Sequence, residues 1–159
     1  MTRDNFAPRP SEPIVLVGPA HPLRGGIAQF TDQLFLHLSQ QSPVDVFTFY
    51  RLFPKLFFPG RTQLDTSQSA IEVPTHLTLD SIGPSSWWRT AAAIAQRRPR
   101  AIVVMHQMPF FAPCTGTLMR LLRRRVSAPQ ILLCHNLIPH EPHWFDAFIV
   151  LSQTVERDL

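Results

Sequence analysis

Short strand-like runs alternate with stretches of helical periodicity along this chain, and that alternation constrains its fold more than any other feature. Runs that are mostly apolar, β-branched or aromatic are typical of strands in a buried parallel sheet. They lie at 14–18, 44–50, 101–105, 130–136 and 147–152. Apolar residues recur at helical spacing between them, at 26–40, 85–98 and 114–125. This order predicts an α/β fold with a Rossmann-like, doubly wound, mainly parallel sheet.

Two of the expected helices carry signals for how they pack and where they begin and end. Helical spacing places Ile27 and Phe30 on the apolar face of the first helix, with Asp32 off that face. Ser85 or Ser86 is a suitable N-cap for the second. Arginines crowd the expected last turn of the second helix, where they would complement the helix dipole.

The remaining segments bound the class of protein. Residues 1–13 are rich in proline and charge and are expected to form a flexible tail, with 14–159 as one domain. The apolar but aperiodic stretch 51–69 predicts an ordered loop. No apolar run approaches the roughly 18 residues of a membrane span, and the start lacks the apolar core of a secretory signal. Cys114 and Cys134 are too few for a disulfide framework, so we expect buried, reduced thiols in a cytoplasmic protein.

Positive charge is concentrated in one part of the chain. The net charge is +4, but residues 81–140 contain eight arginines and neither Asp nor Glu. Such a band suits phosphate, an anionic lipid surface or nucleic acid, and it is also typical of a solvated helix face. No RNP, KH or helix-turn-helix pattern accompanies it, so nucleic acid is not an expected partner. The arginines are Arg89, Arg97, Arg98, Arg100, Arg120, Arg123, Arg124 and Arg125.

A double glycine, Gly25-Gly26, lies between the first expected strand and the first expected helix. Ligands of doubly wound sheets bind at the carboxyl ends of the strands, where this loop would lie. Glycine permits positive φ and close approach of a ligand, and the helix N-terminus behind it favours an anion such as phosphate. The sequence is neither GxGxxG nor a Walker loop, and a tight turn alone would also explain the pair.

GGIAQFTDQL (25–34) resembles the amino-terminal glycine loop of family 4 glycosyltransferases, which use nucleotide sugars and have the GT-B fold. Five further blocks resemble one branch of that family, in the same order. They are YRLFPKLFFPGRTQLD (50–65), SSWWRTAAAIAQRRP (85–99), PFFAP (109–113), HNLIPHE (135–141) and DAFIVLSQTVERDL (146–159). The resemblance implies that residues 14–159 are the amino-terminal, acceptor-side domain of such an enzyme.

The resemblance assigns roles to individual residues. It implies that Gly25 and Gly26 lie against the donor diphosphate and the transferred sugar, with Arg24 as a phosphate or acceptor contact. For Arg24 a solvated surface position is the alternative. His135 would line the sugar site as the catalytic residue, whereas its strand position alone would favour a core histidine. Asn136 would bind carbohydrate or shape the turn.

Two more residues are candidates for substrate binding. Glu141 completes the HNLIPHE block, but no second carboxylate pairs with it as in glycosidases, so it is not expected to be a general base. His106 ends the strand at 101–105, and its register against the family is open. His106, His135, His140 and His143 have no metal-ligand spacing. No cofactor is expected, since the nucleotide sugar is a substrate.

The chain departs from the family in two places. Relatives continue into a second Rossmann-like domain that binds the nucleotide and carries an E-x7-E block, and no such block occurs here. Relatives also have a helix where only residues 142–145 separate HNLIPHE from DAFIV. We therefore expect a truncated protein that is inactive alone, with a fold weakened near 139–147.

Two functions follow from the resemblance. The first is half of a retaining hexosyltransferase for polysaccharide biosynthesis, which needs no metal. It would act from a nucleotide sugar on an envelope lipid or glycan, with a carboxy-terminal half supplied in trans. The alternative is a non-catalytic acceptor- or membrane-binding module, as a split-enzyme subunit or remnant. Both place the protein in the cytoplasm, at the inner face of the membrane.

Aromatic residues and cations occur together in two segments, which favours contact with an anionic membrane surface. The expected helix over 85–98 carries Trp87, Trp88 and Arg89, and the loop 51–61 has a similar mixture. The alternative is that both tryptophans are core residues, which the helical period of the alanines after them also supports.

Overall fold

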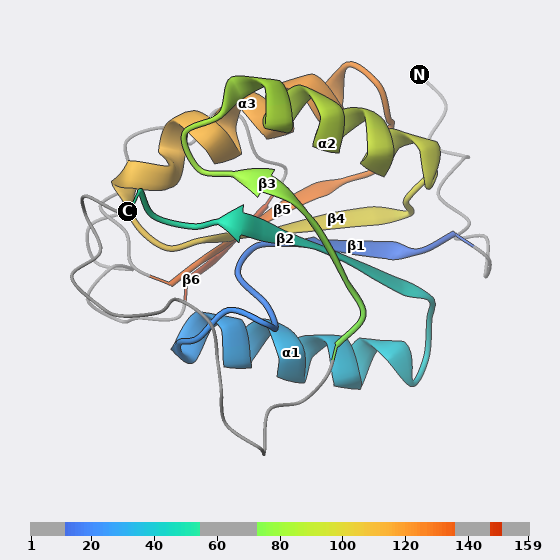
Figure 1. Ribbon diagram of the computed structural model, residues 1–159. Coiled ribbons are helices and arrows are strands. Elements are labelled where there is room, and N and C mark those ends of the chain that lie inside the picture. The colour runs from blue at the N-terminus through green and yellow to red at the C-terminus, as the bar shows by residue number, and fades with distance from the viewer. Residues whose placement is uncertain (1–11, 55–72, 136–146, 151–159) are drawn as a thin grey trace.

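The computed structural model describes residues 12–54, 73–135 and 147–150, which form a layered domain around one sheet (Figure 1). The sheet has six strands in the order β3-β2-β1-β4-β5-β6. Every neighbouring pair is parallel. The strands are β1 (Ile14–Val17), β2 (Val44–Arg51), β3 (Thr75–Asp80), β4 (Ala101–His106), β5 (Gln130–Cys134) and β6 (Ala147–Val150). The predicted α/β fold with a Rossmann-like parallel sheet is therefore confirmed.

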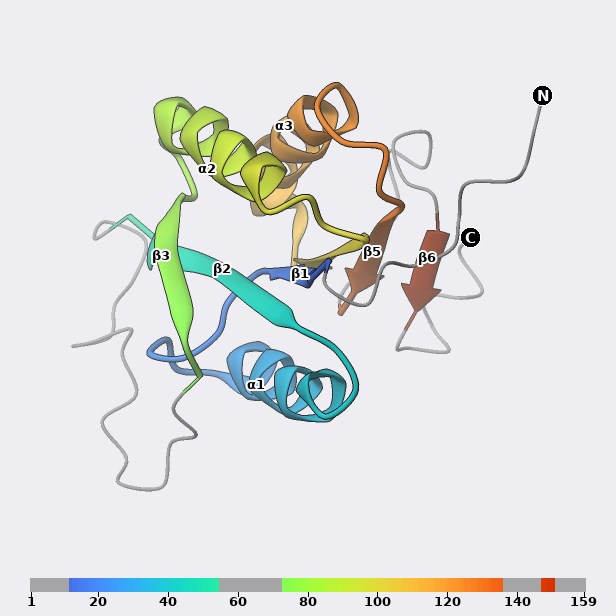
Figure 2. The same cartoon turned by 90° about the vertical axis from the view of Figure 1, so that its right-hand side faces the viewer.

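Helices cover both faces of this sheet (Figures 1 and 2). Helix α1 (Gly26–Ser39) lies on one face, and α2 (Pro84–Gln96) and α3 (Ala112–Arg123) lie on the other. Crossovers between parallel strands are right-handed, so a helix changes face when the direction in which strands are added to the sheet changes. From β1 the chain winds outward through β2 to β3, and α2 then carries it back to β4 on the far side of β1. The strand order therefore reverses between β1 and β4.

Alternation along the strands produces two hydrophobic layers. Val15 and Val17 of β1 belong to the larger core beneath α2 and α3, together with Ile94 and Leu118 of those helices. Leu16 belongs to the smaller core on the α1 side. Because side chains of a strand point alternately to opposite faces, a strand buried on both faces must be apolar throughout. That requirement explains the uninterrupted run IVLV.

Two local expectations are corrected by the structure, and one residue has an unexpected partner. Asp32 is buried, and its carboxylate accepts the backbone N–H of His21 at 3.0 Å. Neither Ser85 nor Ser86 caps α2, which begins at Pro84 after Gly83, since proline is pre-organised for the first helical position. The expected arginines of the last turn lie beyond the helix, which ends at Gln96.

Several expectations fall on residues that the structure does not describe. These are the tail up to residue 11, the loop from 55 to 72, the stretch 136–146 with its expected weakening, and 151–159. Both thiols are free and buried as expected, and burial raises the pKa of Cys114 and of Cys134 to about 12. Among the described residues, none of the helices has the length and apolar character needed to cross a bilayer.

Candidate functional site

The loop after β1 lies at the point where the strand order reverses, which is where doubly wound sheets bind ligands. Its first residue, Gly18, is pressed against β4, since an added Cβ would lie 2.6 Å from the Cβ of Met105. Further along, the N–H of Ala20 donates to the Thr48 hydroxyl at 3.1 Å, and the carbonyl of His21 accepts from the Thr75 hydroxyl at 2.9 Å. These bonds fix the loop against β2 and β3.

The loop ends in the double glycine, and the two glycines have different reasons to be there. Gly25 has φ 134° and ψ 164°, a region that essentially only glycine adopts. Gly26 is in the first turn of α1, and an added Cβ there would have nothing within 4 Å. The protein itself therefore requires glycine at 25, but space within the described structure does not require it at 26.

The N-terminus of α1 is open. Its N-cap residue Gly25 offers no side-chain hydrogen bond, and the first turn contains no acidic residue. Arg24, Gly25 and Gly26 are all exposed. Within the described residues, the first N–H groups of α1 therefore have no side-chain cap, and the positive end of the helix dipole is left for an anion.

His135 follows β5 directly and lies beside α1. Its ring packs edge-on against Phe30, with the centroids 5.0 Å apart. Phe30 is one turn beyond Gly26, so these two residues share a face of the helix. The Phe30 contact thus brings His135 to the side of α1 on which the glycine lies.

The His135 imidazole has an unused hydrogen-bonding group. Its Nε2 is buried and has no hydrogen-bond partner among the described residues. Burial lowers the pKa of His135, which favours the neutral ring. An unpartnered buried nitrogen costs about 1–3 kcal/mol, and a ligand hydroxyl would remove that cost.

His106 ends β4 but points to the other face of the sheet. Its Nδ1 lies 3.5 Å from the hydroxyl of Thr115 on α3, and its carbonyl accepts the N–H of His135 at 2.9 Å. Burial lowers the pKa of His106 as well. The two histidines are therefore joined through the backbone, while their rings lie on opposite faces, and His106 is separated from the glycine loop.

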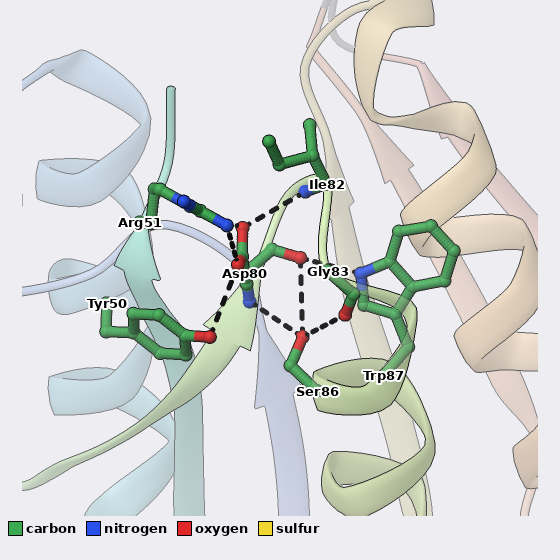
Figure 3. A network of polar contacts seen from close by, with 7 residues as sticks. All are labelled: Tyr50, Arg51, Asp80, Ile82, Gly83, Ser86 and Trp87. Carbon is green, nitrogen blue, oxygen red and sulfur yellow. Dashed lines mark hydrogen bonds and ion pairs between the residues drawn. The ribbon is translucent and has the colours of Figure 1, made fainter. Parts of the chain in front are cut away.

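A second polar cluster at the same edge of the sheet was not expected from the sequence (Figure 3). The Asp80 carboxylate, at the end of β3, accepts bonds from Arg51, from the Tyr50 hydroxyl at 3.3 Å and from the N–H of Ile82 at 3.2 Å. Burial would raise the pKa of Asp80, but the Arg51 and Ile82 bonds outweigh it and lower the pKa. The carboxylate is thus ionised and its oxygens are fully used within the protein.

The backbone of Asp80 is equally well satisfied. Its N–H donates to the Ser86 hydroxyl at 3.0 Å, and its carbonyl accepts the indole N–H of Trp87 at 2.6 Å. Gly83 is required here, since an added Cβ would lie 2.6 Å from an Asp80 carboxylate oxygen. A sequence signal did exist: an acid at the end of a strand, followed by Gly-Pro and Ser-Trp at the start of a helix.

The three residues expected at a membrane surface differ in their exposure to solvent. Trp87 is buried in the core beneath α2, so it takes no part in an exposed surface. Trp88 is 56 % exposed, and the guanidinium of Arg125 lies 5.4 Å from its ring centroid. Arg89 is exposed.

Asn136 and Glu141 lie outside the described residues. Within the described ranges, no group of three His, Cys, Asp or Glu side chains could hold a metal ion. No protein-family model matches the chain, and no curated protein sequence matches it either.

Proposed function

We propose that this chain is the acceptor-side domain of a retaining glycosyltransferase and that α1 and His135 bind part of a nucleotide sugar. The observation that carries the proposal is an uncapped helix N-terminus on the same helix face as an imidazole whose Nε2 has no partner in the part of the chain that the structure describes. The helix end lies at the reversal of strand order, where this class of sheet binds ligands, and His135 follows β5, one strand beyond β4. The sequence blocks from 25–34 to 146–159 supply the resemblance to family 4 glycosyltransferases.

Each group has a chemical task in this proposal. The free N–H groups of α1 hold oxygens of the donor diphosphate, and the helix dipole favours their negative charge. Arg24, exposed beside them, adds a positive charge. His135 is neutral and partly desolvated, so its Nε2 bonds a hydroxyl of the transferred sugar. These groups act where charge develops as the bond between sugar and diphosphate breaks.

Glycine at position 26 is explained by the same proposal. An added Cβ at this site meets no protein atom within 4 Å. A bound diphosphate lying against the main chain would occupy that space, and a methyl group would then exclude it. Substitution by alanine therefore separates a requirement of the ligand from a requirement of the fold.

The test is calorimetric titration with nucleoside diphosphate hexoses, in the presence and absence of a donor-side domain from a GT-B enzyme. We expect binding that strengthens when the second domain is supplied, and turnover only then. Gly26→Ala should weaken binding at least tenfold, which corresponds to about 1.4 kcal/mol, while its thermal stability stays the same or rises slightly. No binding under either condition, or full binding by Gly26→Ala, would contradict the proposal.

The alternative is a non-catalytic module that binds an acceptor or a membrane. Such a module would have the same fold, but its function would require neither binding of a sugar donor nor the imidazole of His135. Donor binding that His135→Ala abolishes favours the enzyme, whereas acceptor binding that His135→Ala leaves intact favours the module.

A further inference from the structure

We propose that the outer surface of α2, together with the ends of β2 and β3, binds the surface of an anionic lipid bilayer. The name basic-aromatic surface is used below for six residues that converge there. They are Tyr50, Arg51, Ile82, Trp88, Arg89 and Arg125. The inference does not depend on the proposed function, because lipid binding requires no sugar donor and uses none of the groups assigned to it.

Contacts between neighbours make these residues one surface. Burial and Asp80 raise the pKa of Tyr50, and the nearby cations Arg51 and Arg89 oppose that rise. Arg89 of α2 is therefore close enough to act on Tyr50 of β2. Trp88 precedes Arg89 on the helix and carries Arg125 of the adjoining α3 segment over its ring. Ile82 joins through its N–H bond to Asp80, which also binds Tyr50.

The surface contains the three most exposed aromatic or aliphatic side chains of α2 and of the ends of β2 and β3. Trp88 is 56 % exposed, Tyr50 55 % and Ile82 47 %. Clustered exposure of this kind marks interaction sites on otherwise polar surfaces. Tryptophan and tyrosine have an apolar body with a polar edge, which suits them to the boundary between lipid headgroups and acyl chains.

The charge of the surface selects an anionic partner. Residues 81–135 contain no Asp or Glu, and the acid nearest to the surface, Asp80, is buried and bonded to Arg51. Arg89 and Arg125 each donate to a backbone carbonyl of their own segment, and no carboxylate pairs with either among the described residues. Each such cation near an anionic leaflet contributes about 1 kcal/mol.

The apolar groups favour lipid over nucleic acid. An aliphatic side chain such as Ile82 gives no stacking to a base, and Arg125 already covers one face of the Trp88 ring. In a bilayer the same groups enter the headgroup region while the guanidinium groups remain at the phosphates. The result is reversible attachment, since no helix of the described residues is long and apolar enough to span.

Co-sedimentation with vesicles tests this proposal on the full chain. One set of vesicles contains phosphatidylcholine alone, and the other contains phosphatidylcholine mixed with phosphatidylglycerol. We expect binding only to the second set, decreasing as salt increases. Arg89→Ser and Arg125→Ser should each weaken binding about fivefold. Trp88→Ser should weaken it several-fold, whereas Trp88→Phe should retain most of it.

Two control variants make the same kinds of substitution outside the basic-aromatic surface. Leu36→Ser removes an exposed apolar side chain from α1, on the opposite face of the sheet. Arg98→Ser removes an equal charge beyond the other end of α2. Both should bind like the wild type, and circular dichroism confirms that each variant is folded.

Three results would overturn the proposal. They are equal or absent binding to both vesicle types, controls that weaken binding as much as the test variants, and full displacement of vesicles by single-stranded RNA.

Discussion

Two polar clusters at the carboxyl edge of the sheet differ in how many of their hydrogen-bonding groups are already satisfied. Around Asp80, every carboxylate oxygen and both backbone groups have partners within the protein (Figure 3). Around α1, the helix end is uncapped, and the Nε2 of His135 has no partner among the described residues. A closed network stabilises the backbone around it, whereas an open one retains capacity for a ligand. The cluster that looks richer in chemistry is therefore the structural one.

The largest effect is expected from opening the closed cluster. Asp80→Ala leaves Arg51, the Ile82 N–H and the Tyr50 hydroxyl without their acceptor. Hydrogen-bond donors left without their acceptor cost about 1–3 kcal/mol, and the Arg51 side chain, which is 45 % exposed, can be rehydrated, so we expect a loss within that range. Urea denaturation measures the loss. The control Asp45→Ala breaks a looser pair with Arg97, at 3.7 Å, and should cost less than about 1 kcal/mol.

The same cluster predicts an acid dependence of stability. The folded pKa of Asp80 is lowered, so its contribution is complete above the unfolded pKa of about 3.9 and is lost as pH falls through the folded pKa. The wild type should therefore lose more stability than Asp80→Asn between neutral pH and pH values below about 3.9. Parallel curves for the two proteins would remove Asp80 from the acid transition.

Substitutions in the glycine pair should distinguish a glycine that the fold requires from a glycine that a ligand requires. Gly25→Ala places a side chain at φ 134°, and such strain costs about 1–3 kcal/mol. Gly26→Ala meets no neighbour and should be neutral or up to about 1 kcal/mol more stable. Thermal unfolding of the two variants tests this contrast. A destabilised Gly26→Ala protein would mean that the fold, not a ligand, requires both glycines.

Particular residues show which parts of the structure could be predicted from the sequence. The helices and the strands β1, β2, β4, β5 and β6 follow from short apolar runs and helical period, so their order was predictable and is confirmed. The positive φ expected in the glycine pair occurs at Gly25. The buried Asp32 was not predictable, because its partner, the N–H of His21, belongs to a loop whose path depends on tertiary contacts.

The sites were less predictable than the fold for the same reason. Position in a strand brings His106 and His135 to one edge but does not say which face each ring occupies. Phe30 and Thr115, from helices on opposite sides, decide that. The local signal around Asp80 marks only the junction of β3 with α2, and it does not encode the approach of Tyr50 and Arg51 from β2. Trp87 and Trp88 are adjacent in α2, but one position along the helix places Trp87 in the core and Trp88 at the surface.

A smaller effect on the free energy of unfolding is expected from substituting two serines near the end of β3, and it should differ between them. Ser86→Ala leaves the buried N–H of Asp80 without an acceptor and removes a 2.7 Å bond to the carbonyl of Gly83, so we expect a loss of about 1–2 kcal/mol. The hydroxyl of Ser81 is buried and has no partner among the described residues, so Ser81→Ala should leave stability unchanged or raise it by up to about 1 kcal/mol. Chemical denaturation of both variants in parallel measures the difference. Equal losses would mean that Ser81 has a partner in the remainder of the chain.

The smallest effect on stability, and the one nearest to function, concerns His135. Its folded pKa is lowered by burial, so its contribution is complete above the unfolded pKa of about 6.5 and is lost as pH falls from there through the folded pKa. His135→Gln should therefore flatten the pH dependence of stability below about 6.5. NMR titration of the imidazole Cε1 protons should give His135 a pKa below that of a free histidine.

The same spectra decide which histidine belongs to the open cluster. Burial also lowers the pKa of His106, so the two histidines titrate in the same direction in the free protein. Only the ring of His135 lies on the α1 face, beside the uncapped helix end. Adding a nucleoside diphosphate hexose together with a donor-side domain should therefore move the titration of His135 and leave that of His106 unchanged. A shift confined to His106 would place the ligand beneath α3 and would reverse the distinction drawn between the two faces.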